Sequence, residues 1–271
     1  MGHSGIFYQR AGERGGRPII LLHGWLLNAG IFEGIMPLFG PGYTVYALDS
    51  RGHGRAAGVD PLPTVAKLAE DLAFLMENER LSDVWLVGHS MGAFVALEYL
   101  ARYGSGAVSA LAMVDMTLLV PCTQDWELGL YGKWQRADIE KFLTLLRLDF
   151  VKGMAYYASH GLCGERDPEK LYGLYQSFFP QLIEDGLLNP EAVIFLYEDL
   201  LTKDYRDFYS TLGLPILLLY GGKSQVYPRK LGERLREMNS NARLKVFNEG
   251  THLLFLEEPE GFVNFLKEMK G

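Results

Sequence analysis

Apolar residues gather along the chain in short continuous runs that are separated by longer stretches with helical spacing. Seven runs, several of which end at glycine or a polar residue, are typical of buried strands: residues 5–12, 17–24, 43–49, 84–90, 108–115, 214–222 and 242–250. Residues 64–80 repeat apolar side chains with a period of about 3.6, and residues 91–103 form another helix-length segment. This alternation predicts a doubly wound α/β protein with a mostly parallel sheet.

The middle of the chain departs from this alternation. Helical patterns dominate residues 117–210, and no convincing strand follows until LPILLLYGG. We therefore expect a helical cap at residues 117–210, inserted into a core of residues 1–116 and 211–271. The insertion is rich in aromatic side chains, a few of which we expect to face the functional site: Trp126, Tyr131, Trp134, Phe142, Phe150, Tyr156, Tyr157, Phe178 and Phe179.

Composition excludes several classes of function. The 271 residues are 48% hydrophobic and 22% charged, enough for a large core. A net charge of −7 without Lys or Arg clusters argues against nucleic acids and anionic membranes, so we expect a small-molecule partner. No apolar run approaches the roughly 20 residues that span a bilayer, and no secretion signal is evident, so we expect a cytoplasmic protein. Cys122 and Cys163 are expected as free thiols.

The clearest chemical signal is Gly88-His89-Ser90-Met91-Gly92, a G-x-S-x-G pattern. It follows an apolar run and begins a helix-length segment, which is the context that this motif requires. Small residues let the backbone turn sharply there and hold the serine hydroxyl beside a positive helix end. We therefore predict that Ser90 is a nucleophile.

Four motifs in order resemble those of the α/β-hydrolase superfamily, and the resemblance covers nearly the whole chain. They are LLHGW (21–25), LDSRGHGRA (48–56), VGHSMGAFVALEYLARY (87–103) and GTHLLFLEEPEGF (250–262). The resemblance implies the α/β-hydrolase fold and a serine hydrolase. In finer detail, HGW and GHSMG are similar to small cap-bearing esterases and to cofactor-free perhydrolases.

His252 is the expected base. Imidazole is suited to take a serine proton near neutral pH, and His252 is on the loop after the last predicted strand. The other histidines are His3 in the N-terminal segment, His160 in the insertion, and three that the family uses for packing or turns: His23, His53 and His89.

The resemblance also assigns the groups that stabilise negative charge in the reaction. It places an oxyanion hole at the backbone N–H groups of Trp25 and Met91. The Trp25 indole is at the same time expected as a wall of the pocket. Arg51 and Asp49 are expected to brace a loop rather than to contact a substrate.

The position of the triad acid is unusual. The resemblance expects an aspartate at about residue 224, where this chain has Ser224. Asp115 ends an earlier predicted strand at the same edge of the sheet, and some α/β hydrolases, the haloalkane dehalogenases among them, carry their acid there. We expect Asp115 to be the acid, provided that its carboxylate lies about 2.6–3.2 Å from the imidazole. Ser224 remains the alternative, as a substitute at the usual position.

Two classes of function stay open. The first is a serine hydrolase that acts on esters, thioesters or lactones of partly apolar acids. The second is a binding protein or receptor with weak turnover, which an absent acid would favour; a cofactor-free lyase, dioxygenase or perhydrolase is a subordinate alternative. The sequence has no phosphate loop, dinucleotide fingerprint or metal cluster, so no cofactor and no metal are expected. It does not set the oligomeric state.

Overall fold

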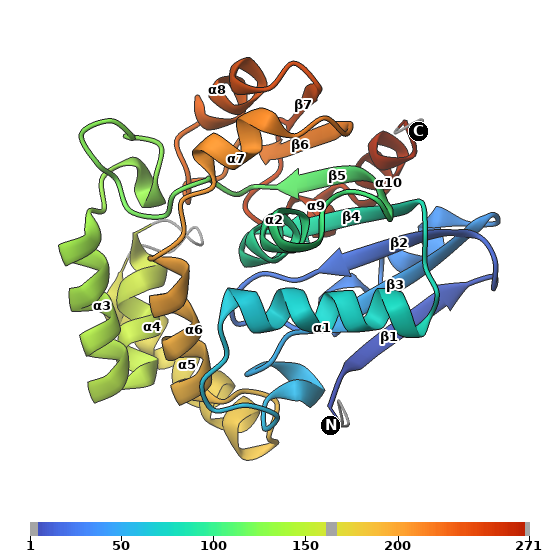
Figure 1. Cartoon of the computed structure of the whole chain (residues 1–271). Coiled ribbons are helices and arrows are strands. Elements are labelled where there is room, and N and C mark those ends of the chain that lie inside the picture. The colour runs from blue at the N-terminus through green and yellow to red at the C-terminus, as the bar shows by residue number, and fades with distance from the viewer. Residues whose placement is uncertain (1–4, 161–166, 269–271) are drawn as a thin grey trace.

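A twisted sheet organises the computed structural model, which describes residues 5–160 and 167–268 (Figure 1). Its seven strands in this part of the chain are β1 (Phe7–Gly12), β2 (Arg17–Leu22), β3 (Tyr43–Asp49), β4 (Val84–His89), β5 (Val108–Val114), β6 (Ile216–Gly221) and β7 (Ala242–Phe247). They lie in the order β1-β3-β2-β4-β5-β6-β7; β1 is antiparallel to β3, and all other neighbours are parallel. The predicted α/β fold with a mostly parallel sheet is confirmed.

Helices cover both faces of the sheet, so its central strands are buried on both sides. Successive residues of a strand point to opposite faces. Leu22 accordingly joins the core formed with α1 (Val65–Asn78) and α2 (Met91–Tyr103), whereas Leu21 joins the core formed with α10 (Pro259–Lys267). Burial on both faces explains why these strands appear in the sequence as continuous apolar runs.

Local signals set the ends of several helices. The Thr64 side chain accepts a hydrogen bond from the Lys67 N–H at the start of α1. At the end of α2, Gly104 adopts a φ of 74°, which glycine tolerates readily. The remaining helices are α3 (Arg136–Leu148), α4 (Phe150–Ser159), α5 (Pro168–Glu184), α6 (Pro190–Leu200), α7 (Arg206–Thr211), α8 (Leu231–Met238) and α9 (Leu254–Glu257), with short 3-10 helices at Ala29–Phe32, Met36–Phe39, Gly54–Ala56 and Leu130–Gly132. No helix among the described residues is long and apolar enough to cross a membrane.

The segment between β5 and β6 contributes α3 to α7 and, in the part that the structure describes, no strand. Figure 1 shows α3 to α6 grouped on the side toward which β2 and β5 point. The carboxyl ends of the parallel strands therefore face these helices. We keep 117–210 as the proposed extent of the cap, although α7 ends at Thr211.

Candidate active site

Ser90 occupies a sharp turn between β4 and α2. Its φ of 50° and ψ of −121° form a backbone conformation that residues with side chains rarely adopt. Glycines make the turn possible: a Cβ on Gly88 would collide with the backbone of Ala93, and one on Gly92 with the backbone of Leu22. The turn leaves Ser90 on the wall of a pocket, at the amino end of α2.

His252 and Asp115 form a buried pair although they are far apart in the sequence. Asp115 directly follows β5, and its N–H donates to the Leu219 carbonyl of β6 at 2.9 Å. His252 lies on the loop after β7, where its Nδ1 is 2.6 Å from Asp115 Oδ2. The side chains are 9% and 1% exposed, respectively. A carboxylate that accepts the Nδ1 proton leaves Nε2 free to act as a base.

Ser224 contacts Asp115 rather than His252. Its hydroxyl donates to Asp115 Oδ2 at 2.6 Å, and the Gly221 N–H lies 3.4 Å from Oδ1 of the same carboxylate. In the described residues Ser224 makes no hydrogen bond to His252. The distance that we required of Asp115 is therefore met, and Ser224, the alternative at the usual acid position, lies next to the Asp115 carboxylate.

His89 supports the loop that carries His252. Its Nε2 lies 2.9 Å from the His252 carbonyl oxygen, and because a carbonyl only accepts, Nε2 carries the proton. Burial, and then the nearby His252, lower the pKa of His89 well below its usual value, so the ring is neutral. The sequence indicates a packing or turn role for His89 but gives no sign of this contact. Ser90 and His252 line one pocket; no hydrogen bond joins them among the described residues, and such bonds often form only when substrate binds.

The two residues expected to provide the oxyanion donors line the same pocket as Ser90. Met91 is the first residue of α2, so its N–H has no carbonyl one turn earlier in the helix to bind. Trp25 lines the same pocket. The Trp25 indole Nε1–H donates to the Val193 carbonyl at 2.8 Å, and its ring packs edge-on against Tyr197. The Trp25 side chain is thus part of the pocket wall.

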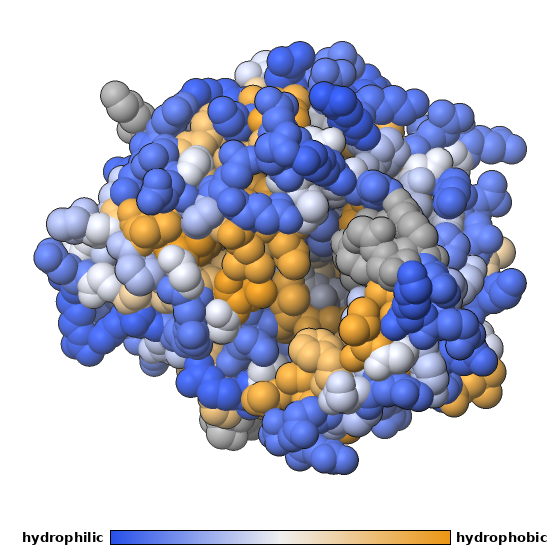
Figure 2. Space-filling model, turned by 180° about the vertical axis from the view of Figure 1, so that it is seen from behind, coloured by the Kyte–Doolittle hydropathy of each residue, from blue (hydrophilic) through white to orange (hydrophobic). Residues whose placement is uncertain are grey.

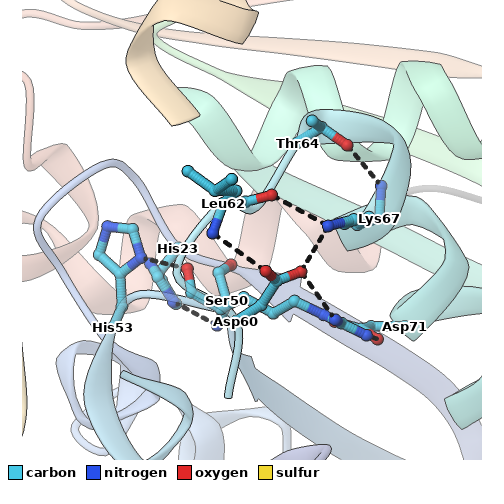
Figure 3. Close-up of polar contacts among 9 residues, drawn as sticks. His23, Ser50, His53, Asp60, Leu62, Thr64, Lys67 and Asp71 are labelled. Carbon is cyan, nitrogen blue, oxygen red and sulfur yellow. Dashed lines mark hydrogen bonds and ion pairs between the residues drawn. The ribbon is translucent and has the colours of Figure 1, made fainter. Parts of the chain in front are cut away.

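His23 and His53 belong to a loop network and are not among the residues that line the pocket (Figure 3). The Ser50 N–H donates to His23 Nε2 at 2.9 Å, and His53 Nδ1 lies 3.0 Å from the Arg51 carbonyl oxygen. Arg51 makes two hydrogen bonds of 2.7 Å to Asp71. Burial, assisted by His23, lowers the pKa of His53 to about 3.

The pocket beside Ser90 has a volume of about 320 Å³ and a mostly apolar wall. Of the aromatic residues expected from the insertion, Tyr157, Phe178 and Phe179 line it. Tyr197 of α6 and Tyr227 of the loop after β6 line it too, although the sequence pattern did not single them out. Figure 2 shows a hollow bordered by hydrophobic residues on one face of the molecule.

Metal ligands do not gather in the described residues: no three His, Cys, Asp or Glu side chains there could hold an ion together. Cys122 is buried and unpaired, and burial raises the pKa of its thiol. His3 and Cys163 lie outside the described residues.

Comparison with known proteins decides the family. A family model described as alpha/beta hydrolase fold matches residues 17–259. The chain belongs to this family. The hydrolase is 26% identical over 252 residues to the pimeloyl-[acyl-carrier protein] methyl ester esterase of Neisseria meningitidis serogroup B, covering 93% of this chain and 92% of the relative. It is 28% identical over 264 residues to the protein of that name from Sodalis glossinidius, covering 96% of each.

Solved structures agree with this assignment. The esterase EaEST from Exiguobacterium antarcticum has a TM-score of 0.79 and 25% identity, covering 97% of this chain and 94% of that one. A bromoperoxidase from Bacillus anthracis shares the fold, with a TM-score of 0.78, 21% identity and coverage of 97% and 94%. The prediction of an α/β-hydrolase enzyme of the carboxylesterase-like kind is confirmed.

Proposed function

We propose that this alpha/beta hydrolase cleaves carboxylic esters, thioesters or lactones of small to medium, partly apolar acids through an acyl-enzyme on Ser90. The observation that carries the proposal is the 2.6 Å distance between His252 Nδ1 and Asp115 Oδ2. It supplies a carboxylate for the base in a chain that lacks one at Ser224. The names of the relatives, which are methyl ester esterases and an esterase, support an ester as substrate.

In the first half of the reaction, Ser90 Oγ attacks the ester carbonyl while His252 Nε2 takes the hydroxyl proton. Asp115 orients the ring and stabilises the imidazolium that forms. The Met91 and Trp25 N–H groups donate to the oxyanion of the tetrahedral intermediate. When the intermediate collapses, the bond to the alcohol oxygen breaks, and the alcohol leaves with the proton from His252.

Water completes the cycle by the same route. It attacks the acyl carbonyl while His252 Nε2 takes one of its protons. The second intermediate collapses with cleavage of the bond to Ser90 Oγ, which recovers that proton. The products are a carboxylic acid and the free enzyme.

The wall of the pocket supports an uncharged acyl group. No Asp, Glu, Lys or Arg is among the described residues that line it. Burying an ionised group without a partner costs several kcal/mol, so a charged acyl chain would be a poor ligand. The pocket volume of about 320 Å³ lies at the lower end of the range for small-molecule sites.

A chain-length series of esters tests the proposal. p-Nitrophenyl and methyl esters from acetate to decanoate are offered to the wild type, to Ser90→Ala and to Ser105→Ala, an exposed serine that serves as the matched control. We expect hydrolysis by the wild type and by Ser105→Ala, and loss of turnover in Ser90→Ala. Failure to hydrolyse any ester, or full activity of Ser90→Ala, would contradict the proposal.

The argument for a receptor with weak turnover was that His252 would lack a carboxylate partner. Asp115 lies 2.6 Å from His252 Nδ1, so that argument no longer favours a receptor. No separate observation in the described residues favours the receptor, or a cofactor-free lyase, dioxygenase or perhydrolase, over ester hydrolysis.

A further inference from the structure

Four tyrosines line the mostly apolar pocket from four different segments. Tyr157 belongs to α4, Tyr175 to α5, Tyr197 to α6 and Tyr227 to the loop after β6. The Tyr227 ring is close to the proposed base, with its centroid 6.3 Å from that of His252. Polar groups few in number on an apolar wall are the usual means by which a pocket selects its ligand.

The hydroxyl of Tyr227 has a weak partner. It donates to Met116 Sδ at 3.0 Å, and a thioether is a poor hydrogen-bond acceptor. Met116 lines the same pocket, so this contact lies at the wall that a ligand would touch. An oxygen atom on a bound molecule would be a stronger acceptor for the same proton.

Tyr157 and Tyr197 belong to the same cluster of phenols as Tyr227. The rings of Tyr157 and Tyr197 meet edge-on with their centroids 6.5 Å apart. Burial first, and then Tyr157 and Tyr227, raise the pKa of Tyr197. Burial raises the pKa of Tyr157, Tyr197 and Tyr227, so each of these phenols keeps its proton near neutral pH. The pocket therefore presents neutral donors and no cation among its described lining residues.

We propose that Tyr227 recognises an uncharged oxygen acceptor, a keto or ether oxygen, in the acyl chain of the substrate. This inference rests on the proposed ester hydrolysis and narrows its substrate class. The oxygen replaces Met116 Sδ as the partner of the hydroxyl. A plain alkanoate fills the same space without improving that hydrogen bond, and a carboxylate would be buried without a counter-charge.

Matched esters test the proposal. Methyl hexanoate is compared with methyl 4-oxohexanoate and methyl 5-oxohexanoate, and kcat/KM is measured for the wild type, Tyr227→Phe and Tyr103→Phe. Tyr103 is 49% exposed on α2 and provides the same chemical change away from the pocket. Within one protein, the ratio of kcat/KM for an oxo ester to kcat/KM for methyl hexanoate does not depend on the fraction of active enzyme. Comparing this ratio between proteins removes the difference in intrinsic reactivity between the esters.

We expect one oxo ester to be preferred by the wild type and by Tyr103→Phe. In Tyr227→Phe the preference should fall by about three- to tenfold, the effect of one neutral hydrogen bond. An unchanged ratio, an equal loss on all three esters, or a wild type that prefers hexanoate would overturn the role of Tyr227 while leaving ester hydrolysis intact. A wild type that cleaves none of these esters, nor any in the chain-length series, would overturn both proposals.

Discussion

Replacing Asp115 with asparagine removes the charge of the proposed triad acid while keeping its shape. The Asp115 side chain is 1% exposed and lies 2.6 Å from His252 Nδ1. In the variant, solvent water therefore cannot replace the lost interaction between the carboxylate and the imidazole. The asparagine amide can also donate to Nδ1, which would put the imidazole in the tautomer that cannot accept the Ser90 proton.

The structure allows the size of this effect to be bounded. In a serine protease triad the same change from acid to amide lowers turnover by about 10⁴. At about 1.36 kcal/mol for each factor of ten, this corresponds to about 5.4 kcal/mol in the barrier. Among the described residues the His252 imidazolium has no carboxylate partner besides Asp115. We therefore expect kcat of Asp115→Asn to fall by about 10³ to 10⁴.

Ser224 provides two further variants with smaller or opposite expectations. Ser224→Ala removes one of the two 2.6 Å contacts to Asp115 Oδ2 but leaves His252 in place, so we expect a loss of about three- to tenfold. From the sequence alone this variant would be expected to have almost no effect. Ser224→Asp sets a second carboxylate against the first, and the two repel each other unless one binds a proton. We expect no gain in activity near neutral pH.

The assay is kcat and KM on p-nitrophenyl butanoate at pH 7.5, with thermal unfolding to verify that each variant is folded. Asp207→Asn, an exposed aspartate at the start of α7, is the matched control and should be as active as the wild type. The reasoning is refuted if Asp115→Asn is as active as the wild type while Ser224→Asp raises activity many-fold. That pair of results would mean that the usual acid position is impaired and that Asp115 has only a structural role.

Three other predictions follow from the same geometry. A fluorophosphonate should label Ser90 alone, at a rate that collapses in His252→Ala; labelling of another serine in a peptide map would contradict the nucleophile. Phe178→Ala, which opens the pocket, should shift the preferred acyl chain toward longer or bulkier groups, whereas Leu174→Ala, 64% exposed on the same helix and not part of the lining, should not. The free energy of unfolding should fall by about 1.4 kcal/mol per pH unit below pH 6.5 on account of His53, because the unfolded chain binds a proton there while the buried ring stays neutral until about pH 3. Urea titrations at several pH values give the free energy of unfolding as a function of pH, and it should change less steeply with pH in His53→Gln. An equal pH dependence in the two proteins would refute this.

Most of the fold could be predicted because its elements are long and buried. Strands such as β4 and β6 are continuous apolar runs, and α1 keeps its apolar period over fourteen residues. The helix α8 was not predicted. It has eight residues, half of them charged, and it is stable because Leu231 and Leu235 pack into the core beside β6 and β7. A helix of that length has little stability of its own, so its sequence carries little signal.

Some residues of the candidate site could likewise be predicted from the sequence, and others could not. Ser90 lies in a local motif and His252 on a terminal loop, and both kinds of position can be recognised along the chain. The pocket residue Tyr197 could not be recognised, because a helix that packs in a core and one that lines a cavity have the same periodicity. Tyr227 could not be recognised either, because it lies on the loop after β6, where no periodicity indicates which side chains face the pocket. The hydrogen bond from His89 to the His252 backbone was equally invisible, since it depends on how two loops meet.

The acid could be located from the sequence only as a pair of alternatives, and the sheet explains why both alternatives were reasonable. β5 and β6 are parallel neighbours, with Val114 opposite Leu219, so the residues that follow them reach the same edge. A carboxylate from either strand end can therefore approach the loop after β7 that carries His252. If Asp115 provides it, as we propose, the side chain at position 224 adjoins that carboxylate: the Ser224 hydroxyl donates to it at 2.6 Å, whereas a second acid there would repel it. Serine at position 224 is thus what a hydrolase with its acid at the end of β5 should contain, and the two positions are expected to change together.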